Sequence, residues 1–195
     1  KPFISLINGY TMGGGVGVSM HGSHIVGSEK TLFAMPETAI GLFPDVGGGW
    51  LLGQLDSGIG SWLSLVGAKI QAYDLMKLKL ITHYVPSNII KSLKEDLISS
   101  SPNTNEKVNS IINQYSTNPN SSESILLEND QIIKDAFSFD TVEEIFNKCE
   151  LISSSGNEFI KSQLDELKHK SPTSLKISLR QIRSASKMSL KDELI

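Results

Sequence analysis

Short apolar runs separated by glycine-containing turns make up residues 1–86. Runs of this length, bounded by Gly, Ser or Pro, are typical of strands. We expect strands at four places, Phe3–Ile7, His24–Val26, Leu32–Met35 and Thr82–Val85. Helices are expected between them, at Gly14–Gly22, Gly48–Leu55, Ile59–Val66 and Ala72–Leu78. This alternation predicts an α/β core over residues 1–86.

From residue 87 onward the apolar residues recur at helical spacing. The repeats that define successive helices are Ile89, Leu93 and Leu97; Val142, Ile145, Phe146 and Cys149; Ile160, Leu164 and Leu167; and Leu175, Leu179 and Ile182. A capping box at Thr141–Glu144 and a Ser171–Pro172 pair predict two of the helix starts. Residues 87–195 therefore form a predicted helical region. Arg180, Arg183 and Lys187, on the outer side of its last helix, are interpreted as solvated.

Residues 99–124 interrupt this helical region with a stretch made mostly of Ser, Asn, Thr and Pro. A segment of this composition buries little apolar area. We therefore expect a segment that is a surface excursion or partly mobile, and that carries no function.

The triplet Gly13-Gly14-Gly15 lies between a predicted strand and a predicted helix. Free N–H groups at the start of a helix can bind an oxyanion or a phosphate. Close packing of the helix on the strand would also require glycine, so both interpretations stay open. Nucleotide-binding fingerprints do not fit, because G-x-G-x-x-G needs a glycine where Val18 or Met20 stands and no G-K-[ST] is present. A serine nucleophile at Ser19 is discounted because the last glycine of G-x-S-x-G is replaced by His21.

Two carboxylates, Glu37 and Asp45, each follow a proline within an apolar segment. Loss of hydration among apolar neighbours raises a carboxyl pKa, and a second carboxylate nearby raises it further. A carboxylate tuned toward neutrality is suited to general base catalysis. The alternative is that both acids cap the helices that follow them. A third acid, Glu29, lies in a Ser-Glu-Lys turn and is interpreted as solvated.

The composition is that of an ordinary domain with a core: 195 residues, 39% apolar, 20% charged, with a net charge of −3. The single cysteine, Cys149, excludes an internal disulfide and is interpreted as a core residue, and the four scattered histidines give no zinc spacing, so no metal is expected. Glycine interrupts every long apolar run, so we expect no membrane partner. Without a basic run, we expect no nucleic-acid partner either.

Three motifs carry a resemblance to a known family. They are Asn8–Gly15, the run Met35–Gly49, and Ser171–Ile177. Together they resemble the crotonase (enoyl-CoA hydratase/isomerase) superfamily and, within it, the 3-hydroxyisobutyryl-CoA hydrolase subgroup. The resemblance implies a crotonase-type (ClpP/crotonase-like) core with a helical C-terminal part. Hydratases of this fold carry a glutamate two residues after the glycine triplet, where this chain has Gly17, so hydration with two glutamates is disfavoured.

The hydrolase resemblance also implies the site and the substrate. It implies Gly14 as an oxyanion-hole amide flanked by Gly13 and Gly15, Glu37 as base or nucleophile, and Asp45 as its partner. The implied reaction converts 3-hydroxyisobutyryl-CoA and water to 3-hydroxyisobutyrate and CoA, a step in valine breakdown. No cofactor is implied, because CoA is part of the acyl-CoA substrate. Two alternatives stay open: an enoyl-CoA hydratase or isomerase, and a non-catalytic assembly subunit of the same fold.

The ends of the chain indicate an internal fragment, because it begins in a strand without methionine and stops within a helical pattern. The resemblance implies a missing N-terminal portion with the first strands, much of the CoA pocket and a second oxyanion amide. It also implies a mitochondrial location, although no targeting segment can be judged. The oligomeric state is left open, and a homo-oligomer is compatible with the sequence.

Overall fold

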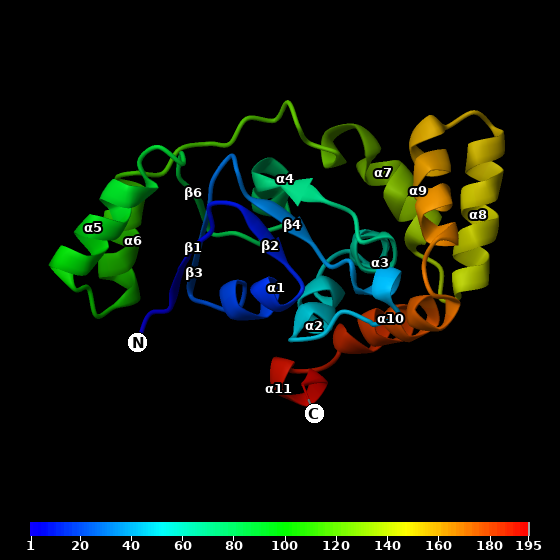
Figure 1. Cartoon of the computed structure of the whole chain (residues 1–195), viewed down its shortest axis with the longest axis horizontal. Coiled ribbons are helices and arrows are strands. Elements are labelled where there is room, and N and C mark those ends of the chain that lie inside the picture. The colour runs from blue at the N-terminus through cyan, green and yellow to red at the C-terminus, as the bar shows by residue number, and fades with distance from the viewer. Residues whose placement is uncertain (195) are drawn as a thin grey trace. The chain divides into compact units, whose positions relative to one another are not determined.

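The computed structural model describes residues 1–194, shown in Figure 1. They form two compact units that interleave along the chain. Unit 1 comprises Lys1–Phe33 and Ile70–Ile125, whereas unit 2 comprises Ala34–Lys69 and the residues from Leu126 onward. The division at residue 86 into a family core and a helical region stays a prediction.

Two small sheets form the centre of unit 1. In the first, β1 (Ile4–Leu6) pairs in parallel with β3 (His24–Gly27), which pairs in parallel with β6 (His83–Tyr84). The second has the order β2 (Tyr10–Met12), β4 (Leu32–Ala34) and β5 (Ile70–Gln71), with β4 and β5 antiparallel. Two short helices belong to the same unit, α1 (Gly14–Ser19) and α4 (Ala72–Lys77). All four predicted strands are present; three are shorter than predicted, β3 extends one residue further, to Gly27, and β2 and β5 are additional to them.

The polar stretch at 99–124 differs from its prediction. After α5 (Ile90–Ser100), it folds into α6 (Asn105–Asn113), and the two helices lie side by side in Figure 1. Val108 and Ile112 of α6 are fully buried, in one apolar cluster with Val26 of β3 and Leu93 of α5. The expectation that this stretch buries little is therefore wrong for α6. Its composition hid two core residues at an i, i+4 spacing, which is sufficient for one buried helical face.

After α6, the last residues of unit 1 donate hydrogen bonds to a buried carboxylate. Asp74, in the first turn of α4, is 1% exposed. It accepts hydrogen bonds from the Ser124 hydroxyl at 2.5 Å and from the Ile125 N–H at 2.9 Å. The side chain thereby joins α4 to residues about fifty positions later in the sequence.

Asp74→Ala is expected to lower the free energy of unfolding by about 2 kcal/mol, because it removes both hydrogen bonds that this buried carboxylate accepts. The measurement is urea denaturation followed by circular dichroism. Glu95→Ala is the matched control, because that carboxylate is exposed and its ion pair with Lys91 is long, at 3.9 Å. Equal stability of the two variants would contradict a stabilising role for Asp74.

Unit 2 is helical and is built around α3 (Ser57–Val66), whose residues from Gly58 to Val66 are all buried. α3 packs against α2 (Gly48–Gly53), α7 (Leu126–Phe137), α9 (Glu158–Lys168) and α10 (Pro172–Ala185). Figure 1 shows α8 (Val142–Ser154) beside α9, and the short α11 (Leu190–Glu193) follows α10. The predicted helix starts are confirmed: Thr141 forms a capping box with Glu144, and Ser171 caps α10 before Pro172. Cys149 is fully buried, as predicted.

None of the helices within residues 1–194 combines the length and the apolar character that crossing a membrane requires.

Candidate active site

Glu37 is the buried acid of unit 2. It is the first residue of a 3-10 helix, η1 (Glu37–Ile40), and is 6% exposed. Its Oε2 atom is buried and makes no hydrogen bond within residues 1–194. Burial raises the pKa of Glu37 to about 7; a backbone hydrogen bond opposes this, and the charge of Asp45 adds to it. The predicted rise in pKa has the expected causes, and the capping interpretation is wrong, because η1 has no side-chain cap.

Asp45 is exposed, and it does not cap a helix either. α2 begins at Gly48, its N-cap is Gly47, and no side chain bonds to it. The Asp45 backbone carbonyl accepts the Gly48 N–H at 2.7 Å, which leaves the carboxylate out of the turn. Because its charge contributes to the pKa of Glu37, the two carboxylates interact within unit 2.

The turn that carries Glu37 is anchored on both sides by its neighbour Thr38, which is fully buried. The Thr38 hydroxyl donates to the Leu65 carbonyl at 3.0 Å, and the Thr38 carbonyl accepts the Ser171 N–H at 3.1 Å. These bonds join η1 to the end of α3 and to the N-cap of α10. Thr38 was not among the predicted site residues, because the sequence gives no sign of which carbonyl a threonine hydroxyl reaches.

Apolar side chains are exposed along residues 40–46, the segment that follows Glu37 and contains Asp45. Ile40, Leu42, Phe43 and Val46 are 74%, 50%, 41% and 38% exposed. These exposed side chains lie on the same short segment as Glu37 and Asp45.

The first glycine triplet, in unit 1, is open rather than packed. Gly13 is the N-cap of α1 with φ 49°, and Gly14 and Gly15 are exposed. A Cβ added at Gly14 would meet nothing within 4 Å, so close packing does not require glycine there. As the first residues of a helix, Gly14 and Gly15 have N–H groups without intrahelical acceptors. The packing interpretation is therefore wrong for Gly14, and its amide is available to a ligand.

The second triplet, in unit 2, is packed tightly. A Cβ at Gly48 would lie 2.3 Å from the Met35 methyl group, and a Cβ at Gly49 would lie 2.3 Å from the Gln181 amide nitrogen. Contacts this short cannot be accommodated without movement. The two triplets look alike in the sequence but have different roles: the second lets α2 approach its neighbours, whereas the first exposes a backbone.

A cavity of about 340 Å³ lies beside the first triplet, lined in part by Tyr10, Thr11, Gly15 and Ser19. The Ser19 hydroxyl donates to the Gly15 carbonyl at 2.7 Å and lies 2.9 Å from the Thr11 hydroxyl. Ser19 is therefore held within its own helix, which agrees with discounting it as a nucleophile.

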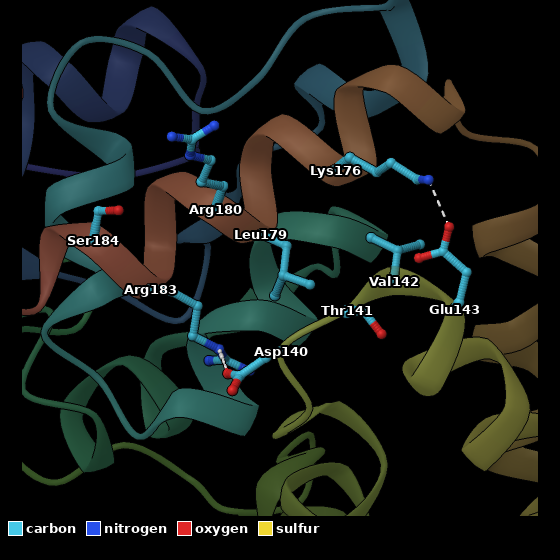
Figure 2. A pocket seen from close by; sticks show the side chains of 9 residues that line it. All are labelled: Asp140, Thr141, Val142, Glu143, Lys176, Leu179, Arg180, Arg183 and Ser184. Atoms are coloured by element: carbon cyan, nitrogen blue, oxygen red, sulfur yellow. Dashed lines mark ion pairs between the residues drawn. The ribbon is translucent and has the colours of Figure 1, made fainter.

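A larger groove, of about 510 Å³, lies between α8 and α10 and contains none of the predicted site residues (Figure 2). Lys176 and Glu143 form an ion pair across it at 2.5 Å. Figure 2 shows the Arg180 guanidinium pointing away from this pair. The cationic side chains of the groove therefore do not converge on one point, as an anion site would require.

Arg183, in the same groove, is not a solvated residue as predicted. Its guanidinium donates to three backbone carbonyls, those of Ser57, Phe137 and Phe139, at 3.0, 3.2 and 2.6 Å. It also lies 3.3 Å from Asp140. Arg183 therefore ties α10 to the ends of neighbouring helices. Glu29, the other acid interpreted as solvated, accepts the Ser87 N–H at 2.9 Å.

Comparison with known proteins supplies the relationship. A model of the enoyl-CoA hydratase/isomerase family matches residues 1–195. The chain belongs to this family. Among curated relatives, the "3-hydroxyisobutyryl-CoA hydrolase, mitochondrial" proteins of Xenopus laevis and Homo sapiens are 44% and 43% identical over all of this chain. The chain spans about half the length of these curated relatives.

Solved structures of the family show the same fold. A carnitinyl-CoA dehydratase from Mycobacterium thermoresistibile matches the whole chain with a TM-score of 0.88 at 31% identity. An enoyl-CoA hydratase from Rhodobacter sphaeroides matches it with a TM-score of 0.83 at 29% identity. The chain covers 54% and 53% of those two proteins. The predicted crotonase-type α/β fold is thus confirmed, and the family resemblance with it.

Proposed function

We propose that the natural protein containing this chain is an acyl-CoA thioester hydrolase that converts 3-hydroxyisobutyryl-CoA and water to 3-hydroxyisobutyrate and CoA. The observation that carries the proposal is Glu37, a buried carboxyl group whose Oε2 atom makes no hydrogen bond and whose pKa is raised to about 7. Such a group contributes little to the fold and is suited to moving a proton near neutral pH. The relatives named as hydrolases support the choice of substrate.

Each of the named residues has a role in the proposed reaction. The Gly14 N–H donates to the thioester carbonyl oxygen, where negative charge develops as the tetrahedral intermediate forms. Glu37 takes a proton from water as the water oxygen bonds to the carbonyl carbon; in the other route, Glu37 itself attacks and water hydrolyses the resulting anhydride. The C–S bond then breaks, and CoA leaves as a thiol after the sulfur is protonated. Asp45 orients the reacting groups or supplies that proton.

We further propose that the reaction needs no cofactor or metal, that it belongs to valine breakdown, and that the protein is mitochondrial. The relatives carry "mitochondrial" in their names. Within residues 1–194, His, Cys, Asp and Glu side chains do not gather in a group of three that could hold a metal ion. Gly13 and Gly15 flank Gly14 in the turn that exposes its N–H group. A homo-oligomer is compatible with the proposed function.

A thioesterase assay on the natural protein tests the proposal. CoA release from 3-hydroxyisobutyryl-CoA is expected, whereas hydration of an enoyl-CoA is not, because Gly17 stands where hydratases carry a second glutamate. Turnover of an enoyl-CoA without hydrolysis of the thioester would favour a hydratase or isomerase. No turnover of either substrate would favour the non-catalytic alternative.

A further inference from the structure

The peptide unit on each side of Asp45 is held by a hydrogen bond. On the C-terminal side, the Asp45 carbonyl accepts the Gly48 N–H at 2.7 Å. On the N-terminal side, the Pro44 carbonyl accepts a hydrogen bond from the Gln181 side chain, on α10, at 2.8 Å. The second bond comes from a residue 137 positions away in the sequence. Gln181 therefore fixes the Pro44–Asp45 peptide from outside the loop.

The orientation of the Gln181 amide is determined by its surroundings. Its nitrogen, Nε2, faces two acceptors, the Pro44 carbonyl and the Glu193 carboxylate of α11, the latter at 2.7 Å. A flipped amide would point its oxygen at both acceptors, so the nitrogen must lie on this side. The amide oxygen is buried and makes no hydrogen bond within residues 1–194. The Gln181 nitrogen thus keeps its hydrogen bond to the Pro44 carbonyl, while the oxygen of the same amide is left without a hydrogen bond among the described residues.

The loop around Asp45 requires such an external support. Val46 and Gly47 both have positive φ, 50° and 79°. For a β-branched residue such as Val46, this conformation is strained and persists only where the surroundings impose it. Gly49 provides the space for the support, because a Cβ there would lie 2.3 Å from the Gln181 nitrogen.

We propose that Gln181 is a positioning residue that holds the Pro44–Asp45 peptide and thereby sets where the Asp45 carboxylate stands relative to Glu37. Gln181 touches no reacting group in this account and acts through Asp45 alone. The expected effect of Gln181 on kcat rests on the proposed function, whereas its expected effect on the interaction of the two carboxylates does not.

The test is a double-mutant cycle in the natural protein with Gln181→Met and Asp45→Asn. Gln181→Met keeps the length of the side chain and removes the donor. Alone, it is expected to lower kcat about 10-fold with little change in KM, because it displaces a group that acts in the chemical step. In the Asp45→Asn background, the same change should have almost no further effect, because residues acting through one another are not additive. Additive losses would overturn the proposal.

Arg180→Met is the matched control, since it makes the same replacement one residue earlier on α10. Arg180 is exposed, and Figure 2 shows no ion pair between its guanidinium and the other labelled residues. The control should keep the original kcat. If Gln181→Met does not fold, Gln181→Glu preserves the shape of the side chain and replaces its donor with an acceptor facing Pro44. Original kcat in the Gln181→Glu variant at neutral pH would likewise overturn the proposal.

A second readout separates this inference from the proposed function. The carboxyl carbon of Glu37 is titrated by NMR and assigned by the loss of its signal in Glu37→Gln. Its midpoint should fall in Gln181→Met, because part of the charge effect of Asp45 is lost, and stay unchanged in Arg180→Met. An unchanged midpoint in Gln181→Met overturns the positioning role even if the thioester is hydrolysed. A lowered midpoint upholds that role even if the protein hydrolyses no thioester.

Discussion

Glu37→Gln is expected to abolish most thioester hydrolysis and, at the same time, to stabilise the fold. The loss in kcat should be about 10³-fold, within the range for removal of a general base. The gain in stability arises because the replacement removes a buried ionised group whose Oε2 atom makes no hydrogen bond. Above pH 7, the free energy of unfolding of Glu37→Gln should be about 2 kcal/mol higher than that of the unmodified protein. Both quantities are measured on the same preparation, by CoA release and by urea denaturation.

The pH dependence of this stability gain has a definite sign. The pKa of Glu37 is about 7 in the folded chain and about 4.5 when unfolded, so the folded state binds more protons between these values. The contribution of Glu37 to the free energy of unfolding therefore decreases as pH rises from about 4.5 to about 7. Glu37→Gln should remove this decrease and give no stability gain below about pH 4.5. Glu150→Gln is the control, because Glu150 lies at an exposed position of α8. It should change neither the rate of thioester hydrolysis nor the free energy of unfolding. Undiminished hydrolysis in Glu37→Gln would contradict the proposed role of Glu37.

Gly14→Pro is expected to lower kcat by about 10²- to 10³-fold while the chain still folds. Proline removes the N–H that is proposed to bind the carbonyl oxygen, and a loss of this size is typical of one oxyanion donor. Gly14 is the first residue of α1, a position where proline is well accepted. A Cβ added at Gly14 would meet nothing within 4 Å, so the Cβ of proline has room there. The measurements are CoA release and circular dichroism.

Gly14→Ala is the control for this change, because it adds a Cβ but keeps the N–H. It should leave the stability of α1 unchanged or slightly raised, since alanine favours helix more than glycine does. Its kcat should lie well above that of Gly14→Pro. Equal activity of the two variants would show that the amide hydrogen of Gly14 takes no part in the reaction.

Local patterns in the sequence were sufficient for much of the fold. Strand and helix positions followed from apolar spacing, and the caps at Thr141 and Ser171 followed from short-range chemistry. The prediction failed where a few residues decided the outcome against the local composition. In α6, Val108 and Ile112 are enough to bury one face of a polar segment. Composition averages over such pairs and cannot reveal them.

The candidate site was predictable as far as its acids, but not as far as their supports. The apolar neighbours of Glu37 in the sequence predicted a raised pKa, and burial is the largest cause of the rise. Thr38 and Gln181 bond to carbonyls far away in the sequence, and Arg183 does the same on α10. Side chains of this kind carry no motif, because the partner is a backbone atom that any residue could supply. Only the fold shows which carbonyl each of them reaches.

The most direct test of the role of Glu37 is the pH dependence of kcat/KM for 3-hydroxyisobutyryl-CoA hydrolysis by the natural protein. If Glu37 acts as a carboxylate with a pKa of about 7, kcat/KM should rise about 10-fold per pH unit below pH 7 and level off above it. The rise should disappear in Glu37→Gln, leaving only a small residual rate. A profile that is flat from pH 5 to pH 8 in the unmodified protein would contradict the central role given to Glu37.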